Sequence, residues 1–126
     1  MTPLWTLEVP EASPSLNRFA NTRRPYAYQQ VRNEWRGYLT SAWWEAKGQW
    51  PMLARLTPPR RARLTVTRFS PRTLDHDNLV GGLKPVIDGL RWLQLIHDDD
   101  ADSLALDVKT EHAKHGKTRL VLEVWN

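Results

Sequence analysis

The sequence predicts an α+β domain in which two main helices pack on a mixed β-sheet of about four strands. Four short segments have the alternation or the apolar content of half-buried strands, and two longer segments repeat apolar residues every three or four positions, as amphipathic helices do. They follow in the order strand, helix, strand, helix, strand, strand. Because 126 residues suffice for one sizeable core and not for two, we expect a single domain over residues 1–126.

The first half of the chain predicts a strand, a loop and a long helix. Residues 5–9 (WTLEV) alternate apolar and polar side chains, and Pro10 ends the strand. Residues 11–24 are rich in turn formers and predict a loop. A helix is predicted from Tyr28 to Lys47. Its apolar face consists of Val31, Trp35, Tyr38, Leu39, Ala42, Trp43 and Ala46, with Trp44 on the opposite side.

The second half predicts a strand, a helix and a pair of strands. Residues 62–69 alternate as a strand does. Asp77 is a candidate N-cap for a helix that runs to about Leu95. Pro85 is expected either to kink this helix or to restart it after a turn at residues 81–82 (GG). Residues 104–108 and 120–124 predict two strands joined as a hairpin through residues 112–117.

The chain is basic, yet its acids are clustered. It carries 18 Lys and Arg against 14 Asp and Glu, a net charge of +4. Six of those acids lie in residues 75–79 (DHDNL) and 98–102 (DDDAD). A cationic surface with a concentrated set of carboxylates suits an enzyme that holds a polyanion and a divalent metal, although a net charge of +4 alone does not specify nucleic acid as the partner.

Several classes of protein are excluded by composition. Without cysteine, the chain has no disulfides, no thiolate zinc site and no cysteine nucleophile. It has no run of 18 apolar residues and no secretory signal pattern at its start, so we expect no membrane segment and a cytoplasmic location.

The two acid clusters predict a metal site. If the chain is extended from Asp75 to Asp77, side chains two residues apart point to the same side and both carboxylates can meet one ion. A third acid is then expected from Asp98, Asp99 or Asp100, which must converge with the first two in the fold. Oxygen ligands without sulfur favour Mg²⁺ or Mn²⁺ over zinc.

Simpler interpretations exist for the same residues. Asp77 serves as well as a plain N-cap, residues 98–102 as a solvated loop, and Lys84 with Asp88 as a surface ion pair one helical turn apart. On these interpretations, neither acid cluster needs a metal ion to explain it.

Two other metal motifs fail on spacing. Asp98, Asp100 and Asp102 match the first, third and fifth positions of an EF-hand loop. The sixth position, however, holds Ser103 instead of Gly, and the twelfth holds Lys109 instead of Glu. His112 and His115 have the spacing of half a metal site without further ligands nearby, which is typical of a polar turn.

Taken in order, five motifs of this chain resemble those of the RusA family of Holliday junction resolvases. They are Pro14-Ser15-Leu16-Asn17-Arg18, Asp75-x-Asp77-Asn78-Leu79, Lys84, Asp88-Gly89-Leu90 and Asp98-Asp99. The resemblance covers most of the chain. It departs from the family pattern in one place, because Lys84 follows Asp77 by seven residues instead of four, as though three residues around Gly81 and Gly82 had been added.

The resemblance implies a RusA-like fold and an Mg²⁺-dependent endonuclease that resolves four-way DNA junctions by symmetric hydrolysis. It implies metal binding by Asp75, Asp77 and Asp99, with Asp98 beside them, and assistance to the chemistry from Lys84. Symmetric cutting requires two active sites, so a homodimer is expected.

Six arginines are candidate DNA contacts: Arg18, Arg23, Arg24, Arg60, Arg61 and Arg72. The exposed tryptophans expected at Trp44 and Trp92 are candidates for an interface. Two other functions fit the same residues, namely a DNA-binding module without catalysis and a carboxylate-metal hydrolase of a small phosphorylated substrate. Dependence on metal separates the first from a nuclease, and dependence on salt separates the second.

Overall fold

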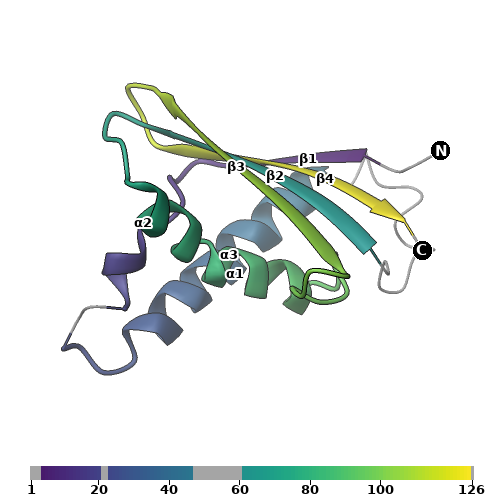
Figure 1. The fold of residues 1–126 in the computed structure, drawn as a ribbon, viewed down its shortest axis with the longest axis horizontal. Helices are drawn as coiled ribbons and strands as arrows, with labels where there is room; N and C mark the ends of the chain where they lie inside the picture. Colours follow the sequence, from purple (N-terminus) through teal and green to yellow (C-terminus); the bar gives the residue numbers. More distant parts are fainter. Residues whose placement is uncertain (1–3, 21–22, 47–60, 126) are drawn as a thin grey trace.

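The computed structural model describes residues 4–20, 23–46 and 61–125, which form one mixed sheet with helices on a single face (Figure 1). The strands are β1 (Leu4–Val9), β2 (Arg61–Ser70), β3 (Leu104–His112) and β4 (Lys117–Trp125). Their order across the sheet is β1-β4-β2-β3. The pairs β1/β4 and β4/β2 are antiparallel, whereas β2/β3 is parallel. The predicted α+β fold with a mixed four-stranded sheet is confirmed.

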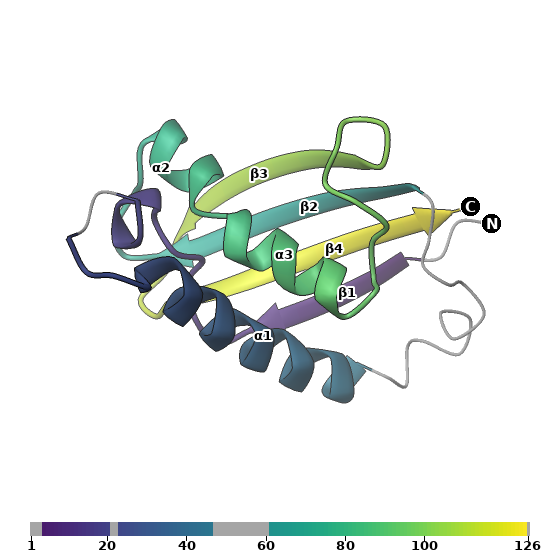
Figure 2. The same cartoon turned by 90° about the horizontal axis from the view of Figure 1, so that it is seen from below.

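Two helices cover the inner face of the sheet, α1 (Ala27–Ala46) and α3 (Lys84–Trp92) (Figure 2). The 3₁₀ helix η1 (Leu16–Arg18) contacts the short helix α2 (His76–Gly81) beyond one end of the sheet. The predicted long first helix is confirmed. Among the described helices, none combines the length and apolarity that crossing a bilayer requires.

The core forms where the alternating strand residues meet the apolar helix faces. Its largest fully buried side chains include Trp5, Trp35, Leu39, Leu64, Leu83, Leu90, Leu120 and Leu122. Trp5 and Trp35 are core residues, as expected from their positions, and Trp43 packs partly against the same cluster. Trp44 is exposed, also as expected.

The predicted hairpin between the last two strands is wrong, because β2 lies between them. β3 and β4 each pair with β2, and residues 113–116 cross over its end. The residue content of the strands explains this order. Leu120, Leu122 and Val124 of β4 are fully buried, whereas β3 is mostly exposed after Leu104. The more apolar strand therefore takes a central position and the more polar one an edge.

The predicted second helix is divided into α2 and α3. Of the two alternatives for Pro85, the structure has the one in which the helix restarts after a turn at Gly81 and Gly82. The helix restarts at Lys84, so that Pro85 lies in the first turn, where a missing N–H leaves no hydrogen bond unmade. Close packing accounts for the glycines. A Cβ on Gly82 would lie 1.8 Å from the carbonyl oxygen of Pro14, and one on Gly81 would lie 2.9 Å from a methyl of Leu16.

The helix α3 ends at Trp92, three residues before the predicted end at about Leu95. Gln94 adopts a left-handed conformation, with φ of 61°. Its N–H donates to the Arg91 carbonyl at 2.9 Å, and the Leu95 N–H donates to the Leu90 carbonyl at 2.9 Å. This is the Schellman arrangement, in which an apolar residue just past the end packs back on the helix. Leu95 continues the apolar pattern for that reason.

The contact at Gly82 predicts a large effect of one methyl group. Gly82→Ala should lower the free energy of unfolding by about 2 kcal/mol or more, because the new Cβ meets backbone that cannot rotate away. Gly37→Ala, at an exposed site of α1 with nothing within 4 Å of the new Cβ, should raise it by about 0.5–1 kcal/mol. Urea unfolding of both variants measures the difference. If Gly82→Ala and Gly37→Ala changed the free energy of unfolding equally, the close packing at Gly82 would be contradicted.

Candidate functional site

The first acid cluster surrounds the start of α2. Asp75 is the N-cap: its Oδ1 accepts a hydrogen bond from the Asn78 backbone N–H, and its Oδ2 accepts one from the Asn78 side-chain amide, both at 2.9 Å. These bonds to the charged form hold the pKa of Asp75 below its ordinary value. The cluster is therefore ordered by its own local hydrogen bonds.

Two expectations about this cluster are corrected. Asp77 is not the N-cap but an exposed residue in the first turn of α2. The chain is also not extended from Asp75 to Asp77, because Asp75 alone is extended and the helix begins at His76. The argument from strand alternation therefore fails, although both carboxylates remain exposed and close in sequence.

Two of the motifs that are distant in sequence meet at α2. The backbone N–H of Asn17 donates to the side-chain oxygen of Asn78 at 3.3 Å. Asn78 thus joins the N-terminal loop to Asp75. The loop before α1 and the start of α2 form one surface.

The second acid cluster follows α3 and is organised around Arg91. The guanidinium of Arg91 lies 3.7 Å from Asp98, 4.0 Å from Asp99 and 3.9 Å from Asp88. Asp98 also accepts a hydrogen bond from the Asp99 N–H at 2.7 Å. That bond first, and then the charges of Arg91 and His97, hold the pKa of Asp98 below its ordinary value. The side chain of Asp100, in contrast, accepts hydrogen bonds from the backbone N–H groups of Asp102 and Ser103 and so closes a turn.

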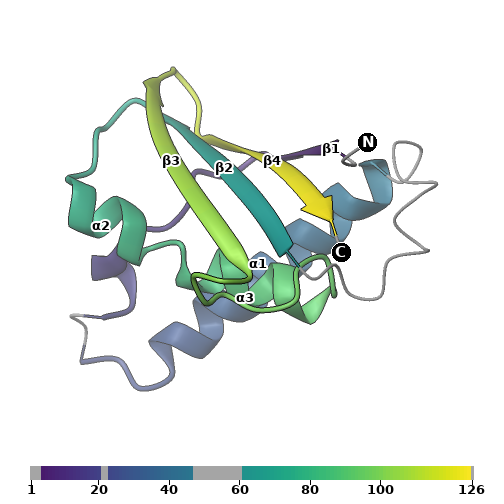
Figure 3. The same cartoon turned by 45° about the vertical axis from the view of Figure 1, so that its right-hand side comes forward.

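The two acid clusters lie at opposite ends of the helix α3. Ala62, near the start of β2, pairs with Leu104, so the acid loop lies beside the beginning of β2, whereas α2 follows its end. A ten-residue strand spans about 30 Å. Figures 2 and 3 show α2 and the loop after α3 well separated, with α3 between them.

A single chain therefore does not bring Asp75 and Asp77 together with Asp98 and Asp99, and the expected convergence within one chain is wrong. In the part of the chain that the structure describes, no three acidic or histidine side chains are grouped closely enough to hold one metal ion. The parallel pairing of β2 with β3 is the physical reason, because the connection has to return along the length of the sheet.

Among the described residues, no carboxylate forms an ion pair with Lys84. It is the first residue of α3, and its Nζ lies 5.2 Å from the ring centre of Tyr28. Asp88, its expected ion-pair partner, instead accepts a hydrogen bond from the Tyr28 hydroxyl and pairs with Arg91. Burial, followed by this bond to Asp88, raises the pKa of Tyr28.

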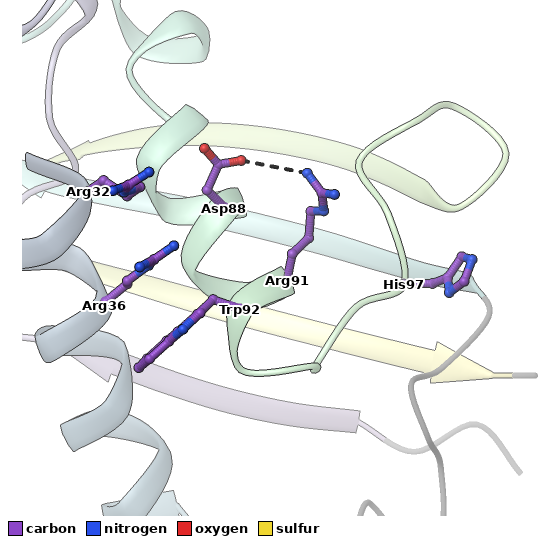
Figure 4. Close-up of a pocket in the computed structure, with 6 residues that line it drawn as sticks. All are labelled: Arg32, Arg36, Asp88, Arg91, Trp92 and His97. Carbon is purple, nitrogen blue, oxygen red and sulfur yellow. Dashed lines mark ion pairs between the residues drawn. The ribbon is translucent and has the colours of Figure 1, made fainter. Parts of the chain in front are cut away.

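A groove between α1 and α3 brings Asp88 and Trp92 together with four residues that the sequence did not single out. It measures about 400 Å³ and is lined by Arg32, Arg36, Asp88, Arg91, Trp92 and His97 (Figure 4). The Arg36 guanidinium lies 5.0 Å from the Trp92 ring centre. One signal was present in the sequence, because Arg32 and Arg36 are four apart and therefore share one side of α1.

The arginines proposed for DNA do not form one patch. Arg18 pairs with Glu34 at 2.7 Å, and Arg24 bonds Gln30 at 2.9 Å. Arg61 begins β2, at the other end from the α2 side of the sheet. Arg23 and Arg72 are exposed, and Arg60 lies outside the described residues.

The Arg91 contacts predict a change in acid titration. Arg91→Gln should raise the pKa of Asp98 toward its ordinary 3.8 without restoring it fully, because the Asp99 N–H still donates. Since the folded-state pKa of Asp98 is lowered, its contribution to stability is present above pH 3.8 and is lost as the pH falls through the folded value. Carbon-detected NMR titration of the carboxyl groups measures this, with Asp75 as the unchanged reference. Identical titration of Asp98 in both proteins would contradict the electrostatic contact.

Comparisons with known proteins do not place the chain in a family. No protein-family model matches it, and no curated protein matches its sequence significantly. The resemblance to the RusA family therefore stays a prediction from the motifs, and the candidate function depends on the residues of this chain.

Proposed function

We propose that this protein is an Mg²⁺-dependent endonuclease that cuts four-way DNA junctions and works as a homodimer inside the cell. The observation that carries the proposal is the placement of two exposed aspartate clusters, Asp75 with Asp77 and Asp98 with Asp99, at the two ends of α3 in an otherwise basic chain. Each cluster alone is an incomplete metal site.

The donor atoms suit a hard divalent ion. Each oxygen of Asp75 accepts one hydrogen bond and has further lone pairs, and Asp77 is exposed beside it. The ion pairs of Arg91 with Asp98 and Asp99 are long and exposed, so they are weak enough to be exchanged for other ligands. When bound, Mg²⁺ supplies charge that activates a water and neutralises the phosphate.

The separation of the clusters requires a second chain for a complete site. Ligands of one ion lie within a few ångströms of one another, whereas the clusters of one chain are separated by the length of α3. In a two-fold dimer, Asp75 and Asp77 of one protomer can face Asp98 and Asp99 of its partner, and symmetry repeats the arrangement once. Two composite sites related in this way match the two symmetric cuts of a four-way junction.

Lys84 supplies a cation at the end of α3 that follows α2, which carries Asp77. It is exposed at the start of α3, and its ammonium contacts the face of Tyr28 instead of a carboxylate. An exposed contact of this kind contributes only about 0.5–1 kcal/mol, so the amine is available to a phosphate oxygen. We assign Lys84 to charge stabilisation at the phosphate that is cut.

A DNA-binding module without catalysis is the second candidate. The observation that favours it is that the acids also serve structural purposes, since Asp75 caps α2 and Arg91 pairs with Asp98 and Asp99. Loss of cleavage on removing the metal separates the two candidates.

Asp75→Asn and Asp77→Asn should each abolish cleavage of a labelled four-way junction in Mg²⁺ while leaving its affinity within about twofold. Asparagine still caps a helix, so Asp75→Asn preserves α2 and removes only the charge. A matched linear duplex and an EDTA reaction are the controls. Unchanged cleavage by both variants would refute the catalytic assignment. A shallow dependence of affinity on salt would favour a small phosphorylated substrate over DNA.

Mixing two inactive variants tests the composite site. Asp75→Asn/Asp77→Asn and Asp98→Asn/Asp99→Asn should each be inactive, whereas refolding them together should restore nicking to roughly a quarter of the wild-type rate. That fraction follows because about half the dimers are mixed and each has one intact site of two. If all ligands came from one chain, every mixed dimer would have two damaged sites and no activity would return.

A further inference from the structure

Two buried arginine donors in the groove between α1 and α3 lack partners. The Nε atoms of Arg32 and Arg36 are inaccessible to solvent, and neither has a hydrogen-bond partner among the residues that the structure describes. Buried polar groups in folded proteins are nearly always bonded, and those of a charged group most of all. Two such donors, one helical turn apart, indicate that an acceptor completes them.

The charges of the groove favour an anion as that acceptor. The single carboxylate that lines it is that of Asp88, and this carboxylate already accepts from Tyr28 and pairs with Arg91. The positive charges of Arg32 and Arg36 both act on Tyr28, whose hydroxyl donates to Asp88. His97 lines the groove as well and adds no negative charge. Among the described residues, no carboxylate forms an ion pair with the guanidinium group of Arg32 or Arg36.

An exposed aromatic side chain borders the two arginines. Trp92 is 53% exposed, and one face of its ring contacts the Arg36 guanidinium (Figure 4). Arginine binds phosphate through a planar fork of donors, and indole rings stack on bases. Arginines beside an exposed ring are the combination by which proteins hold a single nucleic-acid strand.

We infer that this groove is a phosphate-binding subsite, in which Arg32 and Arg36 bind one backbone phosphate of a nucleic-acid strand while Trp92 contacts the adjoining base. The strand as ligand rests on the proposed function, whereas the affinity for phosphate does not. The subsite lies between α1 and α3, away from the α2 of its own chain, and it shares Arg91 with the ion pairs to Asp98 and Asp99. In the proposed dimer it therefore holds DNA beside one composite site. Its volume of about 400 Å³ leaves room for a phosphate with its sugar.

The first experiment titrates the wild-type protein with inorganic phosphate and records ¹H–¹⁵N spectra of the arginine Nε–H and tryptophan indole groups. The Nε–H signals of Arg32 and Arg36 and the indole signal of Trp92, identified with Trp92→Phe, should shift together and saturate. Sulfate should compete, and chloride at equal ionic strength should not shift them. Absence of saturable shifts at Arg32 and Arg36 would overturn the phosphate subsite.

The second experiment measures junction affinity without cleavage, in EDTA and over a range of salt concentrations. Arg32→Gln/Arg36→Gln should bind roughly tenfold more weakly, and the slope of log K against log salt should become shallower by about 0.9, as loss of one phosphate contact requires. Lys117→Gln/Arg119→Gln is the matched control, because it removes the same two charges on the opposite sheet face, where both residues pair with Glu8. Arg36→Lys keeps the charge and loses the planar fork of donors. Its junction affinity should therefore lie between those of the double variant and the control.

The two experiments separate the subsite from the proposed function. Phosphate shifts at the groove without any junction binding by the wild type would overturn the junction endonuclease and the strand as ligand, and leave the phosphate site standing. Junction binding with an unchanged salt slope in Arg32→Gln/Arg36→Gln would overturn the subsite and leave the proposed function standing.

Discussion

The backbone of Gly82 lies against the carbonyl of Pro14 so closely that no side chain fits between them, and the arrangement of α2 depends on this contact. It holds the N-terminal loop beside the turn between α2 and α3. At the other end of α2, Asn78 accepts a hydrogen bond from Asn17 and donates two to Asp75. The glycine turn, the loop and the cap thus form one unit, and the position of the first acid cluster follows from it.

The parallel pairing of β2 with β3 sets the distance between the acid clusters. A parallel connection must leave one end of the sheet and re-enter at the other, and α3 provides that return. Acids placed before and after such a connection are held apart by the fold itself. On the proposed function, this separation is useful, because a chain that carries two halves of different sites is inactive alone and becomes active only as a symmetric pair.

Local patterns could be predicted from the sequence, and non-local ones could not. The periodicity of Val31, Trp35 and Leu39 predicted α1 correctly, since a helix buries one side at a fixed repeat. The strand order could not be predicted, because it depends on which strand occupies the apolar centre of the sheet. The more apolar β4 takes that position, and β3 pairs with the other side of β2. The acid clusters were recognised as unusual, but their separation depends on topology. The groove of Arg32 and Arg36 was missed because half of its lining comes from α3, 50 residues or so further along.

The central position of β4 bears on how the molecule is made. The ribosome synthesises β4 after the other three strands, yet β4 bridges β1 and β2 and fills the middle of the core. Until β4 has left the ribosome, β1 has no hydrogen-bonded neighbour in the sheet. The apolar side of α1 can then pack against only part of the sheet. The nascent chain therefore exposes apolar surface of an incomplete core until β4 is synthesised. A chaperone, or another nascent chain nearby, can bind that surface.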